Sequence, residues 1–159
     1  MTAEMRSPPA EAASKERLRL WLRILKVSRL VEAELREQLR AEFGSTLPRF
    51  DVMAALYRGE KGMKMSELSG VLKVSNGNVT GIVDRLVDEG MVQRVAVEGD
   101  RRATRVRLTA AGRSRFATLA AAHEAWVDRL LGGLDRRETA EMTALLDRIA
   151  HPDAVAEES

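Results

Sequence analysis

The chain has 159 residues, of which 45% are hydrophobic and 31% charged, and its formal net charge is +2, so we expect one globular domain with helical extensions. It has no run of 18 apolar residues that could cross a membrane and no apolar segment typical of a secretory signal near its N-terminus, so we expect a cytoplasmic protein. It also has no cysteine, which excludes disulfides, thiolate metal sites and cysteine-based redox sensing.

The N-terminal part predicts a flexible tail, residues 1–14, followed by a long helix over 15–43. The helical stretch contains neither glycine nor proline, and its leucines recur at helical spacing. At about 1.5 Å per residue it would span roughly 43 Å, too long to bury one whole side within a single domain. We therefore expect part of it to pack against a second copy of the chain. Its basic first half is either a solvated face or a site for ligand phosphates.

A second helix is predicted between two glycines. Gly44 ends the long helix, Leu47 and Pro48 begin the next one, and Gly59 ends it. Residues 62–65 then form a short extended link that can add a third strand to a small sheet.

Residues 66–90 have the pattern of a helix-turn-helix. The first helix runs from Ser66, its expected cap, to Leu72, with Leu68, Val71 and Leu72 facing inward. Ser75 is the expected cap of the second helix, which Gly90 ends. One side of the second helix is apolar, with Val79, Ile82, Val83 and Leu86. The other side carries Asn76, Asn78, Thr80, Gly81, Asp84 and Arg85. In such a motif the second helix enters the DNA major groove.

The segment after Gly90 predicts a β-hairpin. Residues 91–97 are rich in β-formers, and residues 104–108 alternate apolar and basic side chains. The stretch between them, residues 98–103, reads as a hairpin tip with two exposed arginines. A helix-turn-helix followed by a basic hairpin is a winged helix, so we predict a mainly α fold with a small β-hairpin wing.

The C-terminal part predicts two more helices and an acidic tail. Thr109 is the expected cap of an alanine-rich helix from Ala110 to about residue 131, and Gly132-Gly133 breaks it. Asp135 and Glu138 form a capping pair at the start of a last helix that extends to about Ala150. Residues 151–159 are acidic and expected to be disordered. The domain is thus residues 15–150, in which 15–43 and 110–150 are dimerisation helices and 48–109 the winged helix-turn-helix.

The positive charge gathers on the predicted winged helix. Residues 61–115 carry 11 Lys and Arg against 6 Asp and Glu, whereas residues 116–159 carry 4 against 9. A phosphate-contacting surface needs such an excess of positive charge. The alternative is a winged helix that holds another protein instead of DNA, but the wing arginines argue against it. The chain has no GxGxxG, P-loop, HExxH or nucleophile-elbow motif, and its two histidines are far apart, so we expect no enzyme, no metal and no cofactor.

These motifs resemble the MarR family of bacterial transcription regulators over nearly the whole chain. The resemblance is carried by residues 65–68, by 74–86, by Glu89-Gly90-Met91-Val92, by the wing motif Asp100-Arg101-Arg102 and by the exit Leu108-Thr109-Ala110-Ala111-Gly112. It implies a homodimer that binds a palindromic operator in double-stranded DNA, usually as a repressor that a small-molecule effector releases. Residues 47–51 and 75–78 are similar to a branch that controls breakdown of aromatic acids, some of whose members sense a coenzyme A thioester.

The resemblance also implies which residues contact DNA. The helix from Asn76 to Arg85 would read the major groove, and Arg102, held by Asp100, would enter the minor groove. Asn amides pair with adenine, and Arg85 either pairs with guanine or a phosphate or forms an ion pair with Asp84 or Asp88. The full set is Lys64, Lys73, Ser75, Asn76, Gly77, Asn78, Thr80, Gly81, Arg85, Asp100, Arg101, Arg102 and Arg105.

An effector site is expected in the crevice between the dimerisation helices and the winged helix. Its candidate residues are Trp21, Arg23, Phe50, Met53, Tyr57 and His123. An arginine near aromatic rings suits a carboxylate on an apolar ring, such as an aromatic acid. The alternative is that Phe50, Met53 and Tyr57 are core residues, and that His123 is structural.

Overall fold

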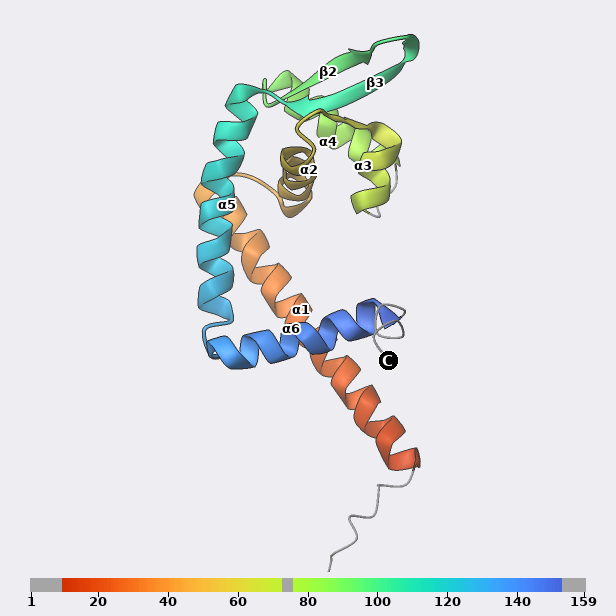
Figure 1. Ribbon diagram of the computed structural model, residues 1–159. Coiled ribbons are helices and arrows are strands. Elements are labelled where there is room, and N and C mark those ends of the chain that lie inside the picture. The colour runs from red at the N-terminus through yellow and green to blue at the C-terminus, as the bar shows by residue number, and fades with distance from the viewer. Residues whose placement is uncertain (1–9, 73–75, 153–159) are drawn as a thin grey trace, which may run out of the picture. The chain divides into compact units, whose positions relative to one another are not determined.

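The computed structural model describes residues 10–72 and 76–152. The chain forms two compact units, Met1–His123 and Glu124–Ser159, which divide within α5. The elements are α1 (Ala10–Phe43), α2 (Leu47–Arg58), β1 (Met63–Lys64), α3 (Met65–Leu72), α4 (Asn76–Asp88), β2 (Val92–Val97), β3 (Asp100–Leu108), α5 (Ala110–Leu130) and α6 (Arg136–Ala150) (Figure 1). Helices with a small antiparallel sheet confirm the predicted fold class.

The sheet has three strands in the order β1-β3-β2, and both strand pairs are antiparallel. Met63 of β1 lies opposite Val106, and Val92 at the start of β2 lies opposite Leu108. The expected third strand beside the wing is therefore confirmed. The hairpin turn is shorter than predicted, because only Glu98 and Gly99 lie between the strands. Gly99 has a φ of 86°, the left-handed conformation that a tight hairpin turn requires.

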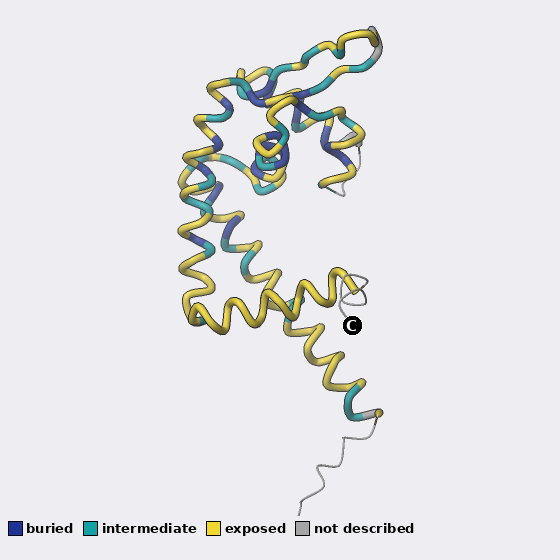
Figure 2. The backbone as a smooth tube through the Cα atoms, viewed as in Figure 1, coloured by how far each residue is buried: buried dark blue, intermediate teal, exposed yellow. Residues whose placement is uncertain are grey.

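The core of the first unit lies where α2, α3, α4 and the base of the hairpin meet (Figure 2). Leu56, Leu68, Val83, Leu86 and Val106 are all at most 1% exposed. At about 25 cal/mol per Å² of apolar surface, burial of these side chains holds α4 in place against the other helices. The core therefore fixes which side of α4 remains exposed.

Three local predictions differ from the structure. Helix α1 begins at Ala10, so residues 10–14 belong to the helix and not to the predicted tail; residues 1–9 lie outside the described part of the chain. Helix α3 begins at Met65, which places Ser66 inside its first turn, where it cannot be the cap. Val71 is 55% exposed, although its spacing predicted an inward position. An eight-residue helix offers too few turns for periodicity to define its buried side.

The end of α4 is closely joined to the start of α5. The N–H of Met91 donates to Leu86 O at 2.9 Å and the N–H of Gly90 to Val87 O at 3.0 Å, a Schellman motif with Gly90 at φ 74°. The Thr109 hydroxyl accepts from Gly112 N at 3.0 Å, which confirms the predicted cap, and donates to Gly90 O at 2.6 Å. A Cβ on Gly112 would lie 1.9 Å from Met91 O, so only glycine fits. The hairpin base is thus fixed to α5.

The second unit contains the end of α5 and the helix α6. Asp135 and Glu138 form the predicted capping box, with Glu138 N donating to Asp135 at 2.8 Å and Asp135 N to Glu138 at 2.9 Å. No residue of α6 is buried, and its apolar side chains are between 43% and 64% exposed (Figure 2): Met142, Leu145, Leu146 and Ile149. None of the described helices is long and apolar enough to cross a membrane.

Candidate nucleic-acid interface

Helix α4 presents one buried side and one exposed polar side. Val79, Val83 and Leu86 are completely buried, whereas Asn78 and Arg85 are exposed. Thr80 and Gly81 are exposed as well. Ile82, predicted to be buried with the apolar stripe, is only half-buried, because it lies at the border between the two sides. The exposed groups are amides, a hydroxyl, a bare glycine and a guanidinium, which can meet base edges and phosphates in a major groove.

Six residues of the predicted interface lie outside the described part of the chain or have only their backbone described. Lys73 and Ser75, with the expected cap, lie outside the described residues. Asn76 and Gly77 form the first turn of α4, and Arg101 and Arg102 belong to β3; only their backbone is described. The roles of these six residues stay predictions.

The wing carries an irregularity at its two arginines. The pairing steps from Ala96 opposite Thr104 to Val97 opposite Asp100. Residues 101–103 therefore lie between paired positions of β3, whereas no residue lies between the corresponding positions of β2. Such a bulge bends a strand and redirects its backbone. The backbone of Arg101 and Arg102 thus leaves the regular ladder near the hairpin tip.

Ion pairs attach α4 to the neighbouring elements. Asp84 forms a 2.6 Å ion pair with Arg94 of β2, so of the two acidic partners considered for Arg85, Asp84 is bound elsewhere. Glu89, just after α4, accepts two hydrogen bonds from Arg49 of α2. No local sequence pattern predicts these roles of Arg49 and Arg94, since their partners lie 40 and 10 residues away.

Two further DNA candidates lie near β1. Lys64 is exposed, and its backbone N–H donates to Glu67 at 3.1 Å. Arg105 is half-buried and donates to Gly62 O at 3.0 Å. Arg105 therefore braces the link before β1 against β3, a structural contact that its basic character did not predict. Asp100 is exposed on the wing.

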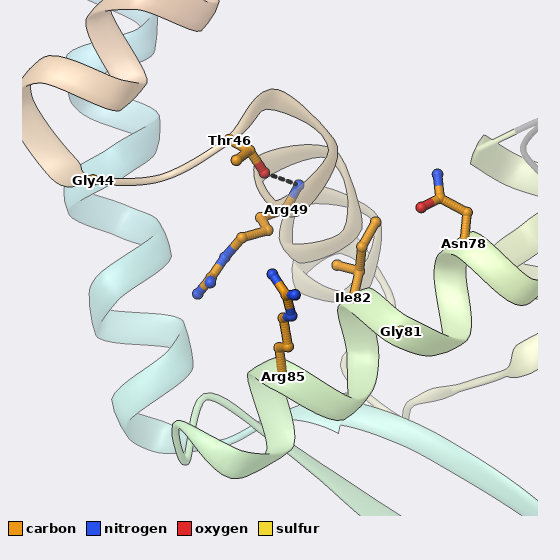
Figure 3. A pocket seen from close by; sticks show the side chains of 7 residues that line it. All are labelled: Gly44, Thr46, Arg49, Asn78, Gly81, Ile82 and Arg85. Carbon is orange, nitrogen blue, oxygen red and sulfur yellow. Dashed lines mark hydrogen bonds between the residues drawn. The ribbon is translucent and has the colours of Figure 1, made fainter.

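Two cavities flank α2 in the first unit. One, of about 450 Å³, opens along the exposed side of α4 (Figure 3) and is lined by Gly44, Thr46, Arg49, Asn78, Gly81, Ile82 and Arg85. The other, of about 470 Å³, is lined by Phe43, Gly44, Ser45, Arg49, Met53, Glu89, Met91, Arg115 and Leu119. Of the predicted effector residues, only Met53 lines either cavity. The described residues hold no cluster of three or more groups suited to a metal ion.

Most of the remaining effector candidates form a packed aromatic cluster. Phe50 stacks on His123, with 4.4 Å between ring centroids, and lies 5.5 Å from Phe116, which in turn contacts Tyr57 at 4.9 Å. Phe50 and Met53 are buried, as the core alternative required, whereas Tyr57 is 39% exposed. Burial lowers the pKa of His123, opposed by the Asp51 carboxylate, and burial raises the pKa of Asp51. Trp21 and Arg23 are exposed on α1, and the structure does not join them to this cluster.

Comparisons with known proteins agree with this geometry. A model described as MarR family matches residues 45–104, from the cap of α2 into β3. The crystal structure of a MarR family transcriptional regulator from Silicibacter pomeroyi is similar with a TM-score of 0.74 and 37% identity, covering 88% of this chain and 96% of that chain. A mutant MarR from E. coli complexed with operator DNA is similar with a TM-score of 0.70 and 27% identity, covering 84% and 95%.

The chain is also similar in sequence to a relative whose name states a role in transcription. The transcriptional activatory protein BadR from Rhodopseudomonas palustris is 32% identical over 113 residues, which are 70% of this chain and 64% of that protein. The similarity to the Silicibacter regulator extends over almost that whole protein, and the exposed side of α4 beside a basic wing is the arrangement that operator binding needs. The chain therefore belongs to the MarR family of DNA-binding transcription regulators.

Proposed function

We propose that the protein is a homodimeric, sequence-specific repressor that releases a palindromic operator when it binds a small aromatic carboxylate or its coenzyme A thioester. The observation that carries the DNA part is the exposed polar side of α4, with Asn78, Thr80, Gly81 and Arg85, which the buried valines hold outward. Asn76, Gly77 and the wing arginines extend this surface in the sequence. A protein-binding winged helix would need none of these groups.

The operator part predicts specific, salt-dependent binding. Fluorescence anisotropy with the duplex upstream of the protein's own gene should give tight binding, and a scrambled duplex of equal length much weaker binding. Each phosphate contact lowers the slope of log affinity against log salt by about 0.9, so both complexes weaken between 50 and 200 mM salt. Equal weak binding to both duplexes would contradict sequence-specific recognition and favour the protein-interaction alternative.

The dimer part rests on apolar side chains that the single chain leaves exposed. Leu18, Trp21 and Leu22 of α1 are each more than half exposed, and the apolar side of α6 is exposed as well. Apolar patches on isolated side chains are common, but a row of them at helical spacing marks an interface. A second copy of the chain is the partner that supplies a matching row.

Removal of residues 1–25 should therefore loosen the dimer, because it deletes Leu18, Trp21 and Leu22 together. Sedimentation at low micromolar concentration should show monomers for this truncation. Removal of residues 1–9 alone, which precede α1, is the matched control and should leave the dimer intact. A fully dimeric 1–25 truncation would show that these side chains do not cross to the partner.

The effector part is supported by the cavity beside α5. Arg115 lines it together with Phe43, Met53 and Leu119, which combines a guanidinium group with apolar side chains; Arg49 also lines it, with both terminal nitrogens bound to Glu89. A carboxylate on an apolar ring matches that lining. The test adds benzoate, a hydroxycinnamate or its coenzyme A thioester to the complex of the protein with a labelled operator duplex. Release of the duplex should lower its fluorescence anisotropy. A transcription assay distinguishes a repressor from an activator. The assay is needed because the relative BadR is named an activatory protein.

A further inference from the structure

Arg49 of α2 lines both cavities of the first unit. The Thr46 hydroxyl caps α2 by accepting from Arg49 N at 3.4 Å, which places Arg49 in the first turn of that helix. Figure 3 shows the Arg49 side chain extending from α2 toward the same space as the Arg85 side chain of α4. Both arginines thus line the cavity that opens along the exposed side of α4.

A carboxylate accompanies this pair of cations. Glu89 accepts from both terminal nitrogens of Arg49, one bond measuring 2.9 Å and the other shorter. This two-bond arrangement is the strongest geometry that an arginine and a carboxylate can form. The hydrogen bond from Arg49 is the main cause that lowers the pKa of Glu89, and Arg85 contributes more weakly in the same direction. Glu89 therefore lies within the electrostatic reach of both arginines and is bound by Arg49.

Helix geometry makes Arg85 the competing partner. Arg85 precedes Glu89 by four residues, and the Glu89 N–H donates to Arg85 O at 3.0 Å, so helical geometry continues through both residues. Side chains four residues apart on a helix are neighbours and form ion pairs when their charges are opposite. If Arg49 did not hold the carboxylate, Glu89 would attract the Arg85 guanidinium along the helix and away from the DNA surface.

The ion pair with Arg49 is a poor candidate for a purely stabilising contact. The Arg49 side chain is 23% exposed and that of Glu89 45%, so solvent screens their attraction, and the two hydrogen bonds fix the orientation of the groups more than they raise stability. Among the described residues, the buried Nε of Arg49 also has no hydrogen-bond acceptor, which reduces any gain further. A role in placing charge explains this arrangement better than a role in stability.

We propose that Arg49 is a positioning residue for DNA recognition: it binds the Glu89 carboxylate and so leaves Arg85 available to the operator. The inference rests on the proposed role of Arg85 in DNA binding. This role of Arg49 differs from simply fastening α2 to α4. It implies that, once Arg49 is removed, the Glu89 carboxylate forms an ion pair with Arg85 and keeps Arg85 from the operator.

The test compares single and double variants in the operator titration. Arg49→Met should weaken operator binding about fivefold, the factor that corresponds to an ion pair of about 1 kcal/mol. The double variant Arg49→Met with Glu89→Gln should regain most of the wild-type affinity, because an uncharged amide no longer attracts Arg85. Arg49→Lys keeps a cation beside Glu89 and should bind within about twofold of wild type.

The alternatives give different results. If the pair only fastens α2 to α4, the double variant binds as weakly as Arg49→Met, and Glu89→Gln alone weakens binding too; either result overturns the inference. Glu89→Gln keeps the test valid even if Arg49→Met unfolds. Arg85→Ala should weaken binding and remove any further effect of Arg49→Met, and full affinity of Arg85→Ala would also overturn the inference. Absence of specific binding by the wild type would instead contradict the proposed function itself.

Discussion

Gly112→Ala is expected to destabilise the protein by about 3 kcal/mol or more, because the new methyl group would lie 1.9 Å from the Met91 carbonyl oxygen. That oxygen belongs to backbone and cannot rotate away. It also accepts the Thr109 N–H at 3.0 Å, so moving it breaks the bond between the cap residue of α5 and Met91. The free energy of unfolding should be measured in urea at one fixed protein concentration, since association changes apparent stability.

The matched control is Gly70→Ala in α3. A Cβ at Gly70 would have no neighbour within 4 Å, and alanine is a better helix former than glycine by up to about 1 kcal/mol. This variant should therefore be as stable as the wild type or more stable. If the free energy of unfolding of Gly112→Ala lay within about 1 kcal/mol of the wild-type value, the close approach of α5 to the hairpin base would be contradicted.

Arg102→Ala is expected to weaken operator binding at least tenfold while leaving the fold intact. An arginine side chain in a narrow minor groove is attracted by its strongly negative potential, and tenfold corresponds to about 1.4 kcal/mol. The backbone bulge at residues 101–103 supports this role, since it takes the backbone of Arg102 out of the regular ladder near the hairpin tip. Anisotropy with the operator duplex, together with circular dichroism, measures both quantities.

Two further variants separate minor-groove recognition from loss of charge. Arg102→Lys keeps the charge but lacks the planar guanidinium, so it should bind more weakly than wild type and more tightly than Arg102→Ala. Arg58→Ala removes an exposed arginine from the last turn of α2 and should change affinity less than threefold, as expected for a distant screened charge. Unchanged affinity of Arg102→Ala would disprove the minor-groove assignment.

Local sequence signals predicted the elements that close over short distances. The side chains of Thr109 and Asp135 each accept a hydrogen bond from the backbone N–H three residues later in the chain. Their capping roles could therefore be predicted directly from the sequence. Gly90 was placed correctly because a helix end needs a left-handed residue at that position. The motifs from residue 65 to Gly112, including those of α4, the wing and the exit from the wing, carried the resemblance to the family.

Local sequence signals predicted burial less well where a side chain is covered by neighbouring elements. Periodicity assigned inward positions to both Val71 and Val83, yet only Val83 is buried, because the eight residues of α3 make too few turns for spacing to define one buried side. Phe50 was predicted from its residue type either to line an effector site or to be core, and it is buried beside Phe116 of α5. Residue type alone cannot distinguish an aromatic ring in a core from one in a binding site.

The sequence by itself determined the wing, the caps Thr109 and Asp135 and the family, because each rests on short motifs whose residues are close to one another in the sequence. Only the tertiary structure decided that Arg49 binds Glu89, that Arg94 binds Asp84 and that Gly112 touches Met91. Those contacts join residues 10 to 40 positions apart in the sequence, and their distances depend on how the helices pack. The physical reason is that hydrogen bonds within one turn follow from backbone geometry, whereas contacts between elements follow from the shape of a shared core.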